Sequence, residues 1–272
     1  MIEGVVFSRN RSLQLDSLLR SIRENFKEIS KITVLYEYDD YHQAGIERII
    51  KKEYGLNISF IRKIDATFKN ILLDIFNNSN DDYITCFCDD DIVMNSKPID
   101  KDVLSILDEG VLSLSLRLGK NIKIRYATDE EVQQPIFSEY KEKCIIWEWD
   151  KAPFDSDWNW PLTISGAIYK KDFLYSLINN LNFKSPNTLE GAMNSKKKLF
   201  INLKSSSLFY SKIINNSVNR VQTDWNNRFG RLVSYTVEEL HDAFMSDKII
   251  DNHSFYNKDY DCIFVEKEIT LK

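Results

Sequence analysis

The sequence predicts a single α/β domain with a mainly parallel central sheet that is flanked by helices. Two observations predict this class. In residues 1–120, short apolar runs typical of strands alternate with segments whose apolar residues recur with a helical period. Only 8 of the 272 residues are glycine and 5 are proline, which excludes collagen-like and Pro/Gly-rich disordered chains. Because strands that alternate with helices usually pair in parallel, we expect helices on both faces of the sheet.

The elements expected in the first half follow one another at short intervals. The strands are rich in β-branched and aromatic residues, and we expect them at 5–8, 31–38, 58–64, 83–87 and 111–116. The helices carry apolar residues three and four apart, and we expect them from Ser12, as the capping residue, through Phe26 and at 44–54, 68–76 and 103–107.

From about residue 121 the alternation becomes less regular. Segment 144–160 is aromatic, acidic and irregular. Beyond it we expect strands at 163–169, 199–208, 213–214 and 262–265, and helices at 171–181, from Asn187 onward and at 237–245. No linker or repeat separates the halves, so we expect residues 1–272 to form one domain with two functional halves, 1–120 and 121–272.

Charge and composition exclude several classes of protein. The net charge of −5 provides no basic surface for nucleic acid, which we therefore do not expect as a partner. Four cysteines and three widely separated histidines favour reduced, buried thiols and do not favour a His-rich metal site. We see neither a signal peptide nor an apolar run of roughly 20 residues, so we expect a cytoplasmic protein without a transmembrane segment; contact with a membrane surface remains compatible with the sequence.

The strongest chemical signal is Asp89-Asp90-Asp91, directly after an apolar strand. Ligands of open α/β sheets bind beyond the carboxyl ends of the strands, so the triplet should meet residues 8–11, 37–40 and 64–65 at one rim. Adjacent carboxylates repel one another and favour a cation, and Mg²⁺ or Mn²⁺ prefers such oxygen ligands. A metal-binding transferase, a phosphatase of the haloacid dehalogenase type and a solvated acidic turn all fit this motif.

Four motifs in this order carry a resemblance to a known family. They are FSRNR (7–11), CFCDDDIVM (86–94), WNWPLTISGAIYKKDFL (158–174) and SPNTLEG (185–191). Together they resemble GT-A fold glycosyltransferases, loosely of the family-2 kind. The resemblance implies a single Rossmann-like GT-A domain, with a nucleotide-sugar-binding half at 1–120 and an acceptor-binding half at 121–272. It also implies an Asp-x-Asp motif that holds Mn²⁺ or Mg²⁺ against a nucleoside diphosphate sugar.

The resemblance implies roles for residues on the donor side. The expected contacts of the donor nucleotide and its phosphates are Ser8, Arg9, Arg11, Glu37, Asp39, Lys69, Asp89 and Asp90. The expected metal ligands are Asp89, Asp91 and Asn219. Arginine suits phosphate recognition, whereas solvated surface roles are the alternative for Arg9, Arg11, Glu37, Asp39 and Lys69.

The second half is expected to hold the acceptor, a saccharide or a glycolipid. Trp158 and Trp160 would stack on a sugar, with core packing as the alternative, and Ser165-Gly166 resembles the strand beneath the acceptor sugar. Glu190 is the expected general base of an inverting transfer. Its alternative role is a capping box with Asn187, and Asp157 is the reserve base.

These observations predict a metal-dependent glycosyltransferase, plausible in surface polysaccharide or glycan biosynthesis. Two other classes remain open at this point. One is a metal-dependent phosphatase or nucleotidyltransferase, and the other is a degenerate module that binds sugars without chemistry. The sequence does not indicate an oligomeric state.

Overall fold

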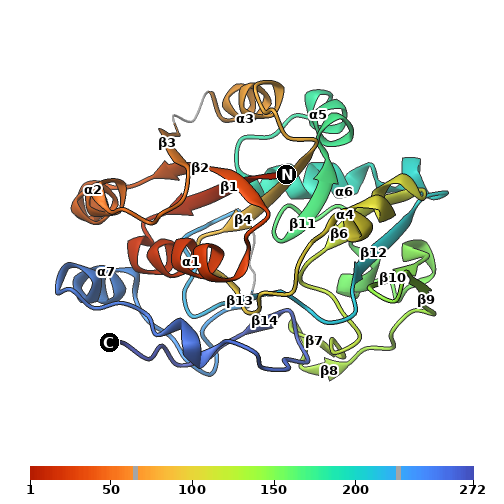
Figure 1. The fold of residues 1–272 in the computed structure, drawn as a ribbon. Helices are drawn as coiled ribbons and strands as arrows, with labels where there is room; N and C mark the ends of the chain where they lie inside the picture. Colours follow the sequence, from red (N-terminus) through yellow and green to blue (C-terminus); the bar gives the residue numbers. More distant parts are fainter. Residues whose placement is uncertain (64–66, 225–227) are drawn as a thin grey trace.

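A nine-stranded sheet forms the centre of the molecule in the computed structural model, which describes residues 1–63, 67–224 and 228–272 (Figure 1). In spatial order its strands are β3 (Ile58–Arg62), β2 (Ile29–Glu37), β1 (Ile2–Arg9), β4 (Tyr83–Cys88), β11 (Ala167–Lys170), β6 (Val111–Ser115), β12 (Lys204–Leu208), β10 (Cys144–Trp147) and β9 (Ser138–Tyr140). The prediction of an α/β fold with a large, mostly parallel central sheet flanked by helices is confirmed.

Strand direction differs along this sheet. β3, β2, β1 and β4 are mutually parallel, so their carboxyl ends lie at one edge. β11 lies between β4 and β6 and is antiparallel to both. Since β11, β12 and β10 come from the second half of the chain, the two halves share one sheet.

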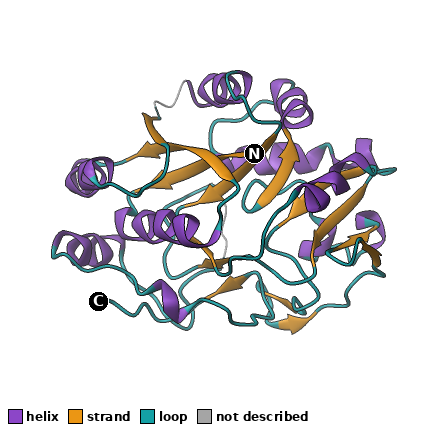
Figure 2. Ribbon diagram, in the orientation of Figure 1, coloured by secondary structure: helices purple, strands orange, loops and turns teal. Residues whose placement is uncertain are grey.

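Helices cover both faces of the sheet (Figure 2). Alternation along β1 explains this, because Val6 faces one apolar cluster while Val5 and Phe7 face the other. The helices that contribute to the first cluster are α1 (Ser12–Asn25), α2 (Gln43–Lys51), α4 (Lys101–Leu104) and α7 (Val237–Met245). Those that contribute to the second are α3 (Phe68–Asn77), α5 (Lys171–Asn179) and α6 (Pro186–Ser195).

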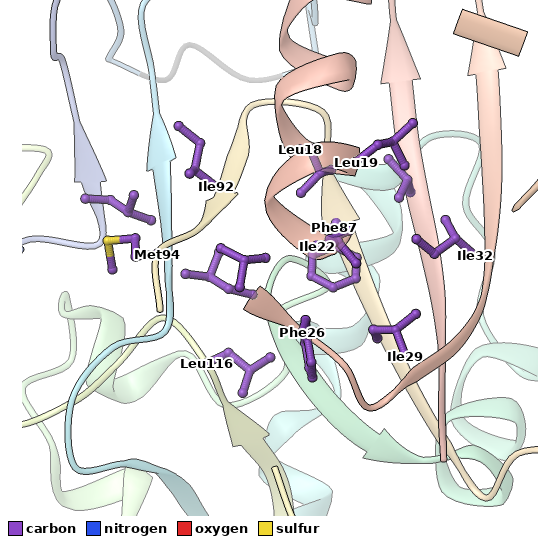
Figure 3. Packing of buried hydrophobic residues seen from close by; sticks show 14 of the residues in the cluster. Leu18, Leu19, Ile22, Phe26, Ile29, Ile32, Phe87, Ile92, Met94 and Leu116 are labelled. Carbon is purple, nitrogen blue, oxygen red and sulfur yellow. The ribbon is translucent and has the colours of Figure 1, made fainter. Parts of the chain in front are cut away.

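Helix α1 shows how the pattern becomes packing. Leu18, Leu19 and Ile22 lie on one side of the helix and are fully buried. Figure 3 shows them, with the following Phe26, against Phe87 of β4 and other side chains of the same cluster. Burying one such side chain contributes about 1.5–3 kcal/mol, so this contact fixes α1 on the sheet.

A second sheet lies beside the end of β4. It has three strands, in the order β14 (Phe264–Val265), β13 (Ile213–Asn216) and β5 (Asp91–Val93). β5 begins at the last residue of the acid triplet, and its antiparallel register places Asn215 opposite Asp91. A two-stranded sheet joins β7 (Ile124–Arg125) and β8 (Glu130–Glu131).

Short 3-10 turns occupy several connections. They are η1 (Asp40–His42), η3 (Ser105–Asp108), η4 (Trp149–Lys151), η5 (Asp157–Asn159), η6 (Lys197–Phe200) and η7 (Asn252–Ser254). No helix in the described parts of the chain is long and apolar enough to cross a membrane.

Some expected boundaries were wrong, for physical reasons. Arg11 precedes α1 as its N-cap and Ser12 is the first helical residue, without a capping side-chain bond. The strand expected at 163–169 begins only at Ala167, because the positive φ of Gly166 interrupts the extended backbone. Residues 199–200 belong to the turn η6 and residues 201–203 are irregular, so the strand β12 begins only at Lys204. The segment 144–160, expected to be irregular, contains β10.

Candidate active site

The carboxyl ends of β1, β2 and β4 open into a cleft of about 1500 Å³. The expected meeting of strand ends is therefore seen in the structure, except that residues 64–65 lie outside the described residues. One side of the cleft, here called the triplet wall, carries Ser8, Arg9, Arg11, Glu37, Asp89 and Asp90. The other side, called the α6 wall, carries Asp157, Trp160, Thr163 and Glu190.

Asp89 is buried where β4 ends. Its main-chain N–H donates to the carbonyl of Phe7 on the neighbouring strand. Its carboxylate accepts hydrogen bonds from the main-chain N–H of Arg9 and from the guanidinium of Arg11, both at 3.0 Å. Burial raises the pKa of Asp89 to about 6, and the charge of Arg11 opposes that rise. The parallel pairing of β1 with β4 therefore ties this carboxylate to the turn that begins α1.

Asp90 faces the cleft between two donors. One oxygen accepts a hydrogen bond from Arg11 at 2.8 Å, and the other accepts one from the amide of Asn215 at 2.6 Å. Arg11 therefore bridges two members of the triplet, and it also donates to the carbonyl of Asn219 at 2.5 Å. Burial lowers the pKa of Arg11, but the charges of Asp90 and Asp89 outweigh burial and keep it above its ordinary value.

Asp91 is fully buried and does not line the cleft. Its carboxylate accepts hydrogen bonds from the N–H of Cys88, the hydroxyl of Ser165 and the amide of Asn215. Burial raises its pKa to about 6. The expectation that Asp91 binds a metal is corrected, because its oxygens accept hydrogen bonds from groups inside the protein; Asp89 and Asp90 are the carboxylates of the triplet that line the cleft.

Two carboxylates of the triplet wall could supply some of the oxygen ligands of a hard cation. Asp89 and Asp90 line the cleft, and each carboxylate oxygen accepts a single hydrogen bond from the described residues, which leaves lone pairs available. Mg²⁺ is often held by one or two carboxylates together with substrate phosphates, so these two residues fit such an ion. In the described parts of the chain, no cluster of three or more His, Cys, Asp or Glu is arranged to hold a metal.

Asn219 lines the cleft but is less suited to this role. Its side-chain oxygen accepts a hydrogen bond from Gln14 at 3.1 Å, and its amide nitrogen is buried and meets no hydrogen-bond partner among the described residues. A cation needs the oxygen of an amide and not its NH₂ group. We therefore do not retain Asn219 as a metal ligand.

Glu190 lies in the second turn of α6, and its carboxylate reaches the cleft. It accepts hydrogen bonds from the indole N–H of Trp160 at 2.7 Å and from the main-chain N–H of Ile164 at 3.0 Å. The capping-box alternative is wrong, because α6 is capped by Ser185 and Thr188. Glu190 is therefore free of the helix start and is oriented by residues that precede β11.

Asp157 lies on the same wall, at the start of η5. Burial raises its pKa; the charge of Arg117 works against this rise, and the charge of Glu190 adds to it. The charges of these two carboxylates of the α6 wall thus influence each other. Both expected base candidates are in the cleft.

The two tryptophans expected to bind the acceptor lie in different environments. Trp160 is 42% exposed and lines the cleft. Trp158 is 1% exposed and does not line the cleft; its ring packs against Trp147 at 5.1 Å and Phe137 at 5.3 Å. Acceptor stacking by Trp158 is therefore wrong, because its place in η5 points the ring into the core.

Two expected donor contacts lie away from the cleft lining. Lys69 donates to the carbonyls of Asn179 and Leu181, at 2.8 and 2.7 Å, and so ties α3 to the end of α5. Asp39 caps η1 and bonds to Asn10 and His42. Nucleotide contacts by Lys69 and Asp39 are therefore wrong in this arrangement, since both side chains complete local structure.

Ser8, Arg9 and Glu37 do line the cleft, as expected. Arg9 pairs with Glu37 at 3.2 Å, and Lys63 pairs with the same carboxylate at 3.0 Å. Ser165 also lines the cleft and donates a hydrogen bond to Asp91. Gly166 does not line the cleft and packs against the side chain of Arg117. The nucleotide and acceptor contacts expected of these residues stay predictions.

Sequence reasoning missed Arg117 and Asn215. Arg117 lines the cleft directly after β6, so the rule that pointed to the ends of the other strands would have found it. Asn215 belongs to β13, and its contact with the triplet depends on pairing between strands 124 residues apart, which no local pattern indicates.

Comparisons with known proteins agree with the resemblance stated from the sequence. No family profile matches the chain. The chain is 22% identical over 196 residues to the bifunctional glycosyltransferase pgtA of Dictyostelium discoideum; the match covers 66% of this chain and 25% of that protein. The chain thus spans about a quarter of the length of this curated relative. The predicted resemblance to a glycosyltransferase is confirmed by this match.

Solved structures give more distant likenesses. S. aureus TarS 1–349 in complex with UDP-GlcNAc has a TM-score of 0.47 and 16% identity, over 76% of this chain and 55% of that chain. A putative glucose-1-phosphate thymidylyltransferase from Bacillus anthracis has a TM-score of 0.41 and 12% identity, over 73% of this chain and 83% of that chain.

Proposed function

We propose that this protein is a glycosyltransferase that moves a sugar from a nucleoside diphosphate sugar to a saccharide acceptor. One observation carries the proposal: a single cleft joins an acid cluster at the strand ends to an oriented, cleft-facing carboxylate on the opposite wall. The glycosyltransferase relative supports the same class. We propose that it acts in the cytoplasm, in the biosynthesis of a surface polysaccharide or another glycan.

The triplet wall would hold the donor. Ser8, Arg9 and Glu37 lie at the ends of β1 and β2, where hydrogen-bonding and charged groups can meet a base, a ribose and phosphates. Asp89 and Asp90 would hold Mg²⁺ or Mn²⁺. When bound, such an ion neutralises charge that develops on a diphosphate leaving group.

The α6 wall would hold the acceptor and its base. Glu190 would take the proton of the acceptor hydroxyl as that oxygen forms a bond to the anomeric carbon. The bond from the anomeric carbon to the diphosphate breaks, and the nucleoside diphosphate leaves with the electron pair. Attack opposite to the leaving group inverts the anomeric centre. Trp160 and the main chain at Ile164 keep the carboxylate of Glu190 in one orientation.

The first experiment measures binding. We would record thermal shifts with UDP, GDP, TDP, CDP and ADP, each with Mn²⁺ and with EDTA. A ligand at 100 times its Kd adds about 2.7 kcal/mol to the free energy of unfolding, which raises Tm clearly. We expect one nucleotide to stabilise the protein, more strongly with Mn²⁺. No shift with any nucleotide would overturn the proposal.

The second experiment separates the rival activities. The nucleotide sugar that corresponds to the binding nucleotide is incubated with a panel of saccharides, and release of nucleoside diphosphate is measured. Pyrophosphate release from a nucleoside triphosphate would instead indicate a nucleotidyltransferase, and phosphate release from an ester would indicate a phosphatase. Binding without any release would indicate a sugar-binding module.

The metal part of the proposal has its own variant. Asp90→Asn should remove the Mn²⁺-dependent part of the thermal shift and leave the shift in EDTA unchanged. The matched control is Asp108→Asn, because Asp108 is an exposed carboxylate that pairs with Lys170 and does not line the cleft. An unchanged Mn²⁺ effect in Asp90→Asn would contradict this assignment.

A further inference from the structure

Arg117 is a buried cation at the cleft whose guanidinium forms no hydrogen bond with the described residues. Its side chain lines the cleft and the residue is only 6% exposed. Both Nε and Nη2 are buried, and neither meets an acceptor in the described parts of the chain. No carboxylate of the described residues pairs with it in the way that Asp89 and Asp90 pair with Arg11.

The surrounding residues hold this guanidinium in one place. It stacks on the ring of Phe264 in β14, with its central carbon 4.3 Å from the ring centre. Its stem passes against Gly166, where an added Cβ would come within 2.7 Å of Cγ of Arg117. Gly166 also has a φ of +64°, a conformation that favours glycine. Only glycine fits well at position 166, because a larger residue would both strain the backbone and collide with the side chain of Arg117.

An arginine held in this way is costly unless something binds it. Guanidinium N–H groups that lose water and gain no acceptor destabilise a folded protein. The charge of Arg117 opposes the rise that burial causes in the pKa values of Asp91 and Asp157, yet neither carboxylate forms an ion pair with it. The planar fork of donors matches the paired oxygens of a phosphate or carboxylate.

We propose that Arg117 binds an oxyanion of the substrate where the triplet wall meets the α6 wall. The oxyanion belongs either to the diphosphate of the donor or to a carboxylate carried by a sugar. This inference deepens the proposed function, and it depends on that function only for the nucleotide part of the ligand. Two observations carry it: Arg117 lines the cleft, and its buried Nε and Nη2 atoms have no acceptor among the described residues.

The test uses calorimetric titration of the full chain with separate probes. They are the five nucleoside diphosphates named above, the matching nucleoside monophosphates, inorganic pyrophosphate, glucuronate, and UDP-glucuronate beside UDP-glucose. The variants are Arg117→Gln and Arg117→Lys. Arg231→Gln is the matched control, since Arg231 is an exposed arginine that pairs with Asp129 outside the cleft.

We expect Arg117→Gln to weaken binding of the oxyanion probe by about 10- to 100-fold, the usual range for loss of charge-assisted hydrogen bonds. Arg117→Lys should keep the positive charge and bind the oxyanion probe with an affinity between those of wild type and Arg117→Gln. Such partial binding would show that the variant is folded. Arg231→Gln should bind like wild type. A loss confined to diphosphates and pyrophosphate identifies the donor phosphate as the source, and a loss confined to uronates identifies a carboxylate.

Two further outcomes separate this inference from the proposed function. If wild type binds no nucleotide but binds pyrophosphate or glucuronate through Arg117, the oxyanion site stands and the proposed function fails. Equal affinities of wild type and both variants for every probe would overturn the oxyanion site. Failure of wild type to bind any of these anions would overturn it as well.

Discussion

The triplet wall and the α6 wall are held in place by different interactions. At the triplet wall, hydrogen bonds and ion pairs hold the side chains in place. Arg11 bridges Asp89 and Asp90, and Asn215 joins Asp90 to Asp91. Behind the α6 wall, aromatic rings pack against one another, with Trp158 between Trp147 and Phe137. The first wall should therefore respond to charge and pH, and the second to the volume of its side chains.

The same difference applies to the chemistry. The carboxylates of Asp89 and Asp90 are held in place by hydrogen bonds from groups of the protein itself. Such fixed carboxylates suit the binding of a charged ligand. Glu190 instead faces the cleft with donors on one side only, from Trp160 and the segment 163–164. A base must exchange a proton with a ligand, so this wall is where we expect the reaction to depend on a single carboxylate.

The largest expected effect is on Glu190. Glu190→Gln should lower the rate of nucleoside diphosphate release by about 10²- to 10⁴-fold, the usual contribution of a general base, while nucleotide affinity stays unchanged. Steady-state kinetics and titration measure the two quantities. Glu148→Gln is the control, because Glu148 is an exposed glutamate that pairs with Lys151. If Asp157→Asn abolishes the reaction and Glu190→Gln does not, Asp157 is the base.

The two tryptophans test the packing of the α6 wall. Trp158→Ala should lower the free energy of unfolding by about 3–5 kcal/mol, because it leaves a cavity in the core. Trp160→Ala should cost about 1 kcal/mol or less, since that ring is already 42% exposed, but it should slow turnover by releasing Glu190. Urea unfolding and kinetics measure these effects. Equal losses of stability would contradict the assignment of one ring to the core and one to the cleft.

Lys212, a buried cation that does not line the cleft, predicts how the stability of the protein depends on pH. This buried lysine precedes β13 and donates to the carbonyls of Asn25, Asn95 and Lys97. Burial lowers its pKa to about 8, below its ordinary value of 10.5. Between pH 8 and 10.5 the unfolded chain therefore binds more protons than the folded chain, so the free energy of unfolding rises with pH.

The measurement for Lys212 is a difference between two proteins. Urea unfolding of wild type and of Lys212→Met is compared from pH 7.5 to 10.5, so that other titrating groups cancel. The advantage of wild type over the variant should grow across this window by roughly 3 kcal/mol at most. Lys248→Met, at an exposed lysine, is the control. A difference that stays flat or falls with pH would contradict the lowered pKa.

The smallest expected effect is on Lys69, in the first turn of α3. Lys69→Met removes hydrogen bonds to the end of α5 and should lower the free energy of unfolding by about 1 kcal/mol. Nucleotide affinity should not change, because this side chain does not line the cleft. A clear loss of nucleotide binding, measured by titration, would restore the sequence-based expectation that Lys69 reaches a phosphate.

Much of the first half could be predicted from the sequence. The strands β1, β2, β3 and β4 and the helices between them follow from apolar periodicity, which depends only on neighbouring residues. Their parallel order places the ends of β1, β2 and β4 at one edge, so Ser8, Arg9, Glu37 and Asp89 could be assigned to one site without coordinates.

Tertiary structure alone decided the second half of the site. The insertion of β11 between β4 and β6 brings Ser165 to Asp91, and it places Gly166 against Arg117. Which of two neighbouring tryptophans enters the core, and whether Lys69 meets a carbonyl or a ligand, likewise depended on distant segments. Local pattern determines which face of an element is apolar, whereas contacts between segments far apart in the chain determine which polar groups remain available to a ligand.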